Sequence, residues 1–301
     1  MSHTINYTQL RPVRSTRAEK RPRVISVASG KGGVGKTLTT VNLAIAARRM
    51  GYSVLVLDGD LGLANVDVVL GLKARYNIND VIEGTVELKD IILTGPLGIE
   101  VIPSGSGLAR LADLSQLERL QLLDQLEAFN RSYDVFFIDT GAGISPNVLH
   151  LNAVSHEIIV VTTPEPHAMT DAYAFIKVMS EQYGEKSYSL IVNMVHSEEE
   201  GLKVSQRITD VARKFLDTKI STLGSIPFDP QMQKSVMMRR AASESSTYTI
   251  AGQSWNRISR QLFQGMTAHE PSHPPGADEG DRKFWRELVM TQSADRARSV
   301  V

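Results

Sequence analysis

A glycine-rich stretch with a lysine and a hydroxyl residue offers the clearest chemistry in this chain. Residues 30–37 read GKGGVGKT, which satisfies the pattern G-x-x-x-x-G-K-[ST]. The stretch follows an apolar run at 24–29 and precedes a helical pattern at 36–50, which is the context that the pattern requires. Glycines let backbone N–H groups turn inward, and a helix start adds a positive end. The sequence therefore predicts a phosphate-binding loop.

The side chains of this loop have distinct expected roles. We expect Lys36 to reach the outer phosphates and Thr37 to place its hydroxyl on Mg²⁺. A glycine-rich turn with no ligand is the alternative, and the position between a β-branched strand and a helix disfavours it. The residues expected to hold the phosphates are Gly30, Gly32, Gly33, Val34, Gly35, Lys36, Thr37 and Leu38.

Three aspartates end apolar runs that read as strands. Asp58 and Asp60 follow the run that starts at 53, and Asp139 ends the run that starts at 134. The carboxyl ends of parallel strands open on the same edge, so these carboxylates should converge near the phosphate loop. Carboxylates suit Mg²⁺, commonly through water, although a strand-end Asp can instead cap a helix. The predicted metal ligands are Thr37, Asp58 and Asp139.

The rest of the chain alternates apolar runs with helical patterns. Continuous β-branched runs suit strands that are buried on both faces of a parallel sheet. The alternation predicts a doubly wound α/β domain with a mainly parallel sheet over 24–266. The expected strands are 24–29, 53–58, 98–105, 134–139, 157–163, 189–195 and 222–229, and the expected helices are 36–50, 115–130, 168–183, 203–216 and 247–264.

Composition limits the classes of function. The 33 Lys and Arg residues balance 33 Asp and Glu residues, so the net charge is zero and direct binding to nucleic acid is not expected. The absence of cysteine excludes disulfides, thiolate zinc sites, cysteine nucleophiles and cysteine-bound iron–sulfur clusters. The histidines form no ligand pattern. With neither a membrane-spanning run nor a secretory signal, a cytoplasmic protein is expected.

The two ends differ from the domain in composition. Residues 1–23 are basic with few apolar side chains and predict a flexible arm, and residues 267–281 predict a linker rich in Pro, Gly and charge. Within 282–301, a short basic amphipathic helix is expected to target anionic membrane. A permanently docked helix that fills a groove of the domain is the alternative. The expected lipid-facing residues are Phe284, Trp285, Leu288 and Val289.

Lys31 makes the loop read K-G-G-x-G-K-T, which resembles the deviant Walker A motif of the MinD/ParA class of SIMIBI-type ATPases. The resemblance implies a slow ATP hydrolase that needs Mg²⁺ and dimerises around ATP. It implies that Lys31 reaches the partner's nucleotide, that Asp60 orients the attacking water, and that Asp139 lies near Mg²⁺. It also implies that Asn193 and Pro227 line the adenine.

Four further segments are similar to the flagellar number regulators called FlhG or FleN. They are DGDLGLANVDVVLGL at 58–72 with NINDVIEG at 77–84, PEPHAMTDAYAFIKVM at 164–179, NMVHSEEEG at 193–201, and FWRELV in the tail. The resemblance implies an ATP-driven switch that sets flagellar number or placement from the inner face of the cell membrane. It implies a flagellar transcription activator and the SRP-type GTPase FlhF as partners.

Two other functions share these residues. One is a nucleotide-held regulatory scaffold with negligible hydrolysis, which differs from the switch in its rate of phosphate release. The other is a division or partition ATPase of the MinD/ParA type. A partition ATPase needs a basic DNA-binding surface on the domain, and the neutral net charge argues mildly against it.

Overall fold

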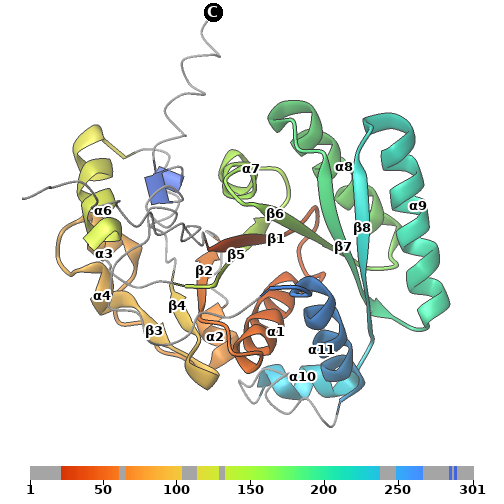
Figure 1. Ribbon diagram of the computed structural model, residues 1–301, viewed down its shortest axis with the longest axis horizontal. Coiled ribbons are helices and arrows are strands. Elements are labelled where there is room, and N and C mark those ends of the chain that lie inside the picture. The colour runs from red at the N-terminus through yellow and green to blue at the C-terminus, as the bar shows by residue number, and fades with distance from the viewer. Residues whose placement is uncertain are drawn as a thin grey trace, which may run out of the picture.

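The computed structural model describes residues 22–60, 66–103, 114–128, 133–237 and 249–266, together with residues 285, 286, 288 and 289. Its centre is a sheet of eight strands in the order β3-β4-β2-β5-β1-β6-β7-β8 (Figure 1). All neighbouring strands run parallel except β3 and β4. The strands are β1 (Arg23–Ser29), β2 (Val54–Gly59), β3 (Leu93–Thr94), β4 (Glu100–Ile102), β5 (Val135–Ala142), β6 (Glu157–Thr162), β7 (Ser187–Val195) and β8 (Lys219–Pro227).

Helices connect these strands and cover both faces of the sheet. The long ones are α1 (Lys36–Arg49), α6 (Gln116–Ala128), α8 (Pro166–Tyr183), α9 (Glu198–Leu216) and α11 (Ile250–Leu262). The short ones are α2 (Val66–Leu70), α3 (Ile78–Ile82), α4 (Leu88–Ile91), the 3₁₀ turn η1 (Pro96–Gly98), α7 (Pro146–Ala153) and α10 (Pro230–Met237). Among the described helices, none is long and apolar enough to cross a membrane.

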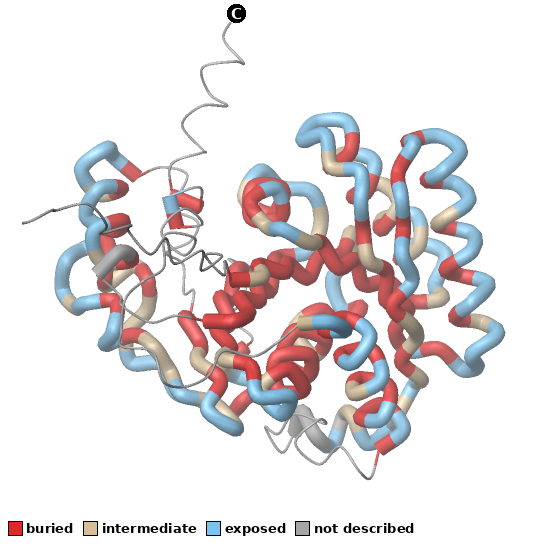
Figure 2. Tube along the Cα trace, viewed as in Figure 1, coloured by how far each residue is buried: buried red, intermediate tan, exposed pale blue. Residues whose placement is uncertain are grey.

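Alternation of side chains along the strands divides the core into two faces. One face of the sheet packs against α1 and α11, with Phe137 and Trp255 among its largest buried side chains. The opposite face packs against α7, α8 and α9 over the half that contains β7, and against α3, α4 and α6 over the half that contains β2. The strands are accordingly buried along almost their whole length in the middle of the molecule (Figure 2).

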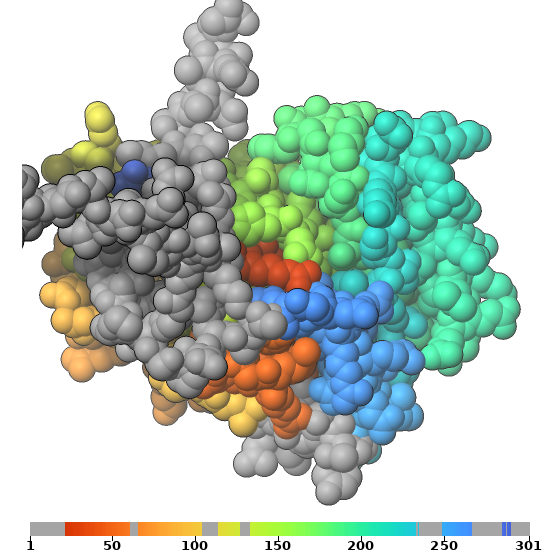
Figure 3. All heavy atoms as spheres, in the orientation of Figure 1, coloured from red at the N-terminus to blue at the C-terminus, as the bar shows by residue number. Residues whose placement is uncertain are grey.

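The start of β1 is joined to the end of α11. The guanidinium of Arg23 pairs with Glu157 at the start of β6, donates to the carbonyl of Leu262 and lies over the ring of Phe263. Figure 3 shows the blue surface of α11 against the red surface of β1. This contact fixes the amino-terminal end of the central strand β1. The phosphate loop follows the opposite, carboxyl-terminal end of the strand.

The doubly wound, mainly parallel fold predicted from the sequence is confirmed. Each predicted strand and helix has a counterpart, and the boundaries differ most at α9, which starts at Glu198 because the Ser197 side chain accepts a hydrogen bond from the N–H of Glu200. The predicted strand 98–105 covers only 100–102 among the described residues. The short α2, α3, α4, α7 and α10 and the antiparallel β3 were not predicted. Residues 1–21 of the arm and the linker 267–281 lie outside the described residues.

Candidate functional site

The phosphate loop lies between β1 and α1, as the motif predicts. Gly35 is the N-cap of α1 with a φ of 93°, and no side chain caps this helix start by a hydrogen bond. A Cβ on Gly35 would lie 2.3 Å from the Nδ2 atom of Asn193, and one on Gly30 would lie 2.0 Å from the carbonyl oxygen of Asp171. Both glycines are therefore required by close packing, and Gly35 also by its left-handed backbone. The uncapped N–H groups of α1 suit an anion.

Lys36 is buried beneath this loop, so its charged side chain is shielded from bulk water. Residue Lys36 is only 7% exposed. Burial lowers the pKa of Lys36 below the usual 10.5, while the nearby Asp139 and Asp60 raise it. The lysine therefore faces two carboxylates from two different strand ends, and phosphate oxygens would give it the anionic partner that burial requires.

Asp139 at the end of β5 is the most deeply buried carboxylate of the site. Burial raises its pKa from 3.8 to about 6, against the opposing effects of Thr37, Lys36 and Thr40. The hydroxyl of Thr40 donates to Oδ1 at 3.1 Å, whereas Oδ2 is buried with no hydrogen-bond partner among the described residues. A buried carboxylate oxygen without a partner, beside the Thr37 hydroxyl, is the donor set that a hydrated Mg²⁺ uses. The residues present therefore fit this ion.

The other two aspartates follow β2 and differ in their surroundings. Asp58 is buried, and its two carboxylate oxygens accept hydrogen bonds from the N–H groups of Asp60 and Val66, each at 3.2 Å. Asp58 therefore holds both ends of the segment between β2 and α2. Asp60 is half-buried and directs its carboxylate toward Gly141 and Lys36. The register places Asp58 directly beside Asp139, so strand pairing brings the acidic residues together as predicted.

The described residues contain no group of three or more His, Asp or Glu side chains that could hold a metal ion alone. A cation bound beside Asp139 would therefore need oxygens from phosphate or water in addition to Thr37 and the carboxylates. Mg²⁺ is commonly bound in this way, because it keeps several waters and shares substrate phosphates with one or two carboxylates.

Lys31 at the tip of the loop has a partner that the sequence did not reveal. Its Nζ lies 2.7 Å from Oε2 of Glu165, the residue that precedes α8. The two side chains are 39% and 64% exposed, so the pair is weak and easily exchanged. The lysine lowers the pKa of Glu165 through a hydrogen bond and its charge. An acidic residue three positions after the end of β6 at Thr162 was the available signal for this contact.

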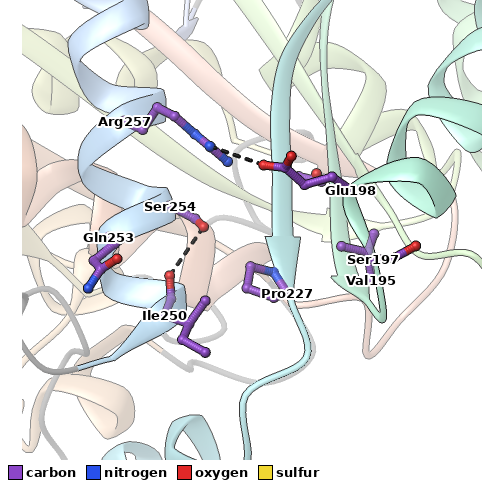
Figure 4. Close-up of a pocket in the computed structure, with 9 residues that line it drawn as sticks. Val195, Ser197, Glu198, Pro227, Ile250, Gln253, Ser254 and Arg257 are labelled. Atoms are coloured by element: carbon purple, nitrogen blue, oxygen red, sulfur yellow. Dashed lines mark hydrogen bonds and ion pairs between the residues drawn. The ribbon is translucent and has the colours of Figure 1, made fainter.

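Asn193 and Pro227, the residues expected to line a base, lie on the neighbouring strands β7 and β8. The Nδ2 of Asn193 donates to the carbonyl of Val34 at 2.9 Å, which ties β7 to the phosphate loop. Pro227 lines a groove of about 380 Å³ above β8, between the start of α9 and the helix α11 (Figure 4). Arg257 and Glu198 meet across this groove at 3.3 Å. Contact of Asn193 and Pro227 with a base stays a prediction.

Replacing Lys36 should abolish tight nucleotide binding. In Lys36→Ala the outer phosphates lose a charge-assisted hydrogen bond, which is worth about 1.5–3 kcal/mol, or roughly a 10- to 150-fold loss of affinity. Calorimetric titration with ATP and Mg²⁺ measures the change. Lys177→Ala on the exposed surface of α8 is the matched control and should bind like the wild type. Wild-type affinity in Lys36→Ala would show that the phosphates bind elsewhere.

Asp139→Asn should stabilise the protein without nucleotide and Mg²⁺, increasingly as the pH rises from about 4 to 6. Because the folded pKa of Asp139 lies above 3.8, the folded state keeps its proton over this range while the unfolded state loses it, so wild-type stability falls. The full difference, on the order of 2–3 kcal/mol, should appear above pH 6. Urea unfolding in EDTA at several pH values measures it. A difference that is independent of pH would contradict the assignment.

Comparisons with known proteins agree with this geometry. The family model described as "ParA: NUBPL iron-transfer P-loop NTPase" matches residues 20–263. The chain is 38% identical to the antiactivator FleN of Pseudomonas aeruginosa over 80% of this chain and 86% of that protein. It is 34% identical to the flagellum site-determining protein YlxH of Helicobacter pylori over 89% of this chain and 90% of that protein.

A solved structure shows the same fold. The septum site-determining protein MinD of Pyrococcus horikoshii, complexed with Mg-ADP, superposes with a TM-score of 0.64 at 25% identity and covers 81% of this chain and 96% of its own. This chain contains no cysteine with which to hold an iron–sulfur cluster, although the description of the family model refers to iron transfer. The motif, the fold and these similarities together show that the chain belongs to the ParA family of P-loop NTPases, in its MinD/ParA class.

Proposed function

We propose that this protein is an ATP-dependent, dimerising ATPase switch that sets the number or placement of flagella. The observation that carries the proposal is the buried constellation of Lys36 and Asp139 beneath the phosphate loop, with Lys31 at the loop's tip. The names of the similar FleN and YlxH proteins support the flagellar role. The proposed partners are a flagellar transcription activator and the SRP-type GTPase FlhF.

The residues of the site divide the work of hydrolysis among them. The N–H groups at the start of α1 and the ammonium of Lys36 hold the phosphates and stabilise the charge that develops on them. Thr37 and Asp139, with Asp58 beside them, would hold Mg²⁺, which would neutralise phosphate charge when bound. Asp60, half-buried beside Lys36, orients the attacking water and accepts its proton. Asp58 fixes the segment that carries Asp60.

Lys31 connects nucleotide binding to dimerisation in this proposal. On its own subunit the lysine pairs with Glu165 at the surface, where solvent screens the ion pair and keeps it weak. A triphosphate on a second subunit offers the ammonium several anionic oxygens and a drier setting, so exchange from Glu165 to that triphosphate is favourable. Two copies of the site facing each other would each receive a lysine from the partner.

ATP should convert Asp60→Ala into a stable dimer through Lys31. Without Asp60 hydrolysis stops, so ATP persists and the dimer accumulates, and Lys31→Ala in that background should return the protein to monomer. Light scattering after gel filtration with ATP and Mg²⁺ measures the mass. Lys203→Ala, an exposed lysine on α9, is the control. A monomer of Asp60→Ala at saturating ATP would contradict the proposal.

Phosphate release by the same proteins separates the switch from a scaffold that binds nucleotide without hydrolysing it. The switch requires slow release by the wild type and none by Asp60→Ala. Equal rates for the two proteins would favour the scaffold.

The C-terminal segment is the proposed membrane-binding element. Of the four residues expected to face lipid, Trp285, Leu288 and Val289 are buried on the domain at 4%, 3% and 2% exposure, and Phe284 lies outside the described residues. This burial fits both a segment that ATP releases from the domain and a permanently docked segment, and we propose the former. Each such side chain gains about 1.5–3 kcal/mol from burial, so release needs a compensating apolar environment. A lipid surface supplies it, and a dimer presents two segments to the same surface.

ATP should therefore promote reversible binding to anionic vesicles. Sedimentation of Asp60→Ala with phosphatidylglycerol vesicles should recover several-fold more protein with ATP than with ADP, because two linked segments bind more tightly than one. Arg286→Glu changes an exposed basic residue of the segment and should weaken binding without disturbing the core. Equal recovery with ATP and ADP would favour a permanently docked segment.

A further inference from the structure

The C-terminal segment is held on the domain by two polar contacts as well as by apolar packing. Arg119 of α6 donates through Nη1 to the carbonyl of Val289 at 2.7 Å, and Nε2 of His150 in α7 lies 3.0 Å from the carbonyl of Leu288. A carbonyl oxygen only accepts, so Nε2 carries the proton in this contact. Figure 1 shows the helical residues of the segment between α6 and α7.

These two side chains give the segment hydrogen-bond donors that apolar packing alone does not supply. Arg119 brings a charged donor and His150 an N–H donor to two neighbouring backbone carbonyls, and a charged donor makes the stronger hydrogen bond. Arg119 is itself only 7% exposed, and its Nε donates to the carbonyl of Leu114 at 3.1 Å. A buried guanidinium is costly unless its donors are used, and the carbonyl of Val289 accepts from one of them.

The apolar part of the contact reaches the strand that carries Asp139. Trp285 lies against Phe136 of β5 with ring centroids 5.5 Å apart, and it belongs to the same buried cluster as Ile138 and Leu151. Phe136 and Ile138 share one face of β5, and Asp139 directly follows Ile138. The segment and the phosphate site are therefore neighbours along one strand.

Helix α7 contacts the phosphate site and the C-terminal segment at the same time. A Cβ on Gly141 would lie 3.2 Å from Cγ2 of Val148, and one on Gly59 would lie 2.8 Å from Cδ1 of Leu151. These glycines adjoin the strand ends that carry the three aspartates, and the loop after β5 leads directly into α7. The side chains of Val148 and Leu151 therefore pack closely on these backbones, which gives a shift of either strand end a direct contact with the helix that carries His150.

We propose that Arg119 and His150 form a latch that holds the C-terminal segment on the domain, and that α7 transmits changes at the phosphate site to this latch. The latch itself stands on the contacts above, and only its release by ATP rests on the proposed function. A shift of the β5 backbone at Gly141 moves Val148 of α7, and His150 on the same helix then loses its hydrogen bond to the carbonyl of Leu288. Arg119 and His150 are positioning residues in this scheme and take no part in hydrolysis.

Trp285 can report the latch directly. The chain has two tryptophans, Trp255 and Trp285. Trp255→Phe removes the other fluorophore, and because the Nε1 of Trp255 has no hydrogen-bond partner within the described part of the chain, the substitution breaks no hydrogen bond there. In this background and without nucleotide, Trp285 should emit as a buried indole that acrylamide quenches poorly.

Substitution of either latch residue should expose Trp285 in the absence of ATP. We expect Arg119→Ala and His150→Phe to raise the acrylamide quenching constant several-fold and to shift the emission to longer wavelength. Arg119→Lys and His150→Gln keep a donor and should restore much of the protection. Arg213→Ala, which removes an exposed arginine of α9, is the matched control and should change nothing. Nucleotide affinity and far-ultraviolet circular dichroism show that each variant is folded.

Unchanged quenching in both folded latch variants would overturn the latch, and His150→Phe alone decides if Arg119→Ala fails to fold. The relay has a separate test in the Asp60→Ala background, where ATP and Mg²⁺ should expose Trp285. Val148→Ala should still bind ATP and dimerise but should lose most of that exposure. Full exposure in Val148→Ala would overturn the relay through α7.

Vesicle binding distinguishes failure of this inference from failure of the proposed function. Latch variants should bind phosphatidylglycerol vesicles with ADP as well as with ATP. If Trp285 becomes exposed and yet neither nucleotide gives vesicle binding, the latch stands and the membrane role is wrong. If ATP drives vesicle binding while the latch variants protect Trp285 as the wild type does, the membrane role stands and the latch is wrong.

Discussion

The burial of opposite charges beneath the phosphate loop is the constraint on which the rest of the structure depends. Lys36 and Asp139 both lie in the interior, where each charge loses its water, and burial opposes the charged form of each. Only close partners make such burial tolerable. The hydroxyl of Thr40 and the two carboxylates supply part of this compensation, and phosphate oxygens with a cation would complete it. Binding of phosphate and a cation would therefore complete the charge compensation of the site.

Strand order follows from that requirement. The lysine comes at the end of the loop after β1, and the carboxylates come from β2 and β5, so β5 must lie between β1 and β2 for the carboxylates to meet the lysine. The pairing of Asp58 with Asp139 in register shows how closely the two strand ends are aligned. Glycines at 59 and 141 then let the side chains of α7 pack closely on these strand ends. The same close packing that positions the carboxylates thus couples them mechanically to α7.

The sequence predicted what depends on local pattern and missed what depends on pairing across the fold. The loop, the strand-end aspartates and the parallel sheet are all visible in short stretches, because apolar runs and glycine spacing carry the information. The contacts of Lys31 with Glu165 and of Arg119 with Val289 join residues 134 and 170 positions apart, and no local pattern indicates them. Helix α7 was missed because it is short and begins with Pro146, which reads as a turn.

For the C-terminal segment, the amphipathic pattern predicts an apolar face but does not determine whether lipid or protein covers it. Trp285, Leu288 and Val289 form an apolar face that suits lipid or protein equally, because burial of apolar area does not depend on what covers it. Polar groups distinguish the two environments. On the domain, His150 and Arg119 donate side-chain hydrogen bonds to the carbonyls of Leu288 and Val289, and the acyl region of a bilayer offers no side-chain donors of this kind. The two donors therefore favour the docked position specifically. The apolar face favours the domain surface and a lipid surface alike. A small displacement breaks the two hydrogen bonds but barely weakens the apolar contact, because hydrogen bonds depend steeply on distance and angle. Hydrogen bonds that fix the position, combined with apolar contact that does not, therefore suit a segment that must leave its domain when a ligand binds elsewhere.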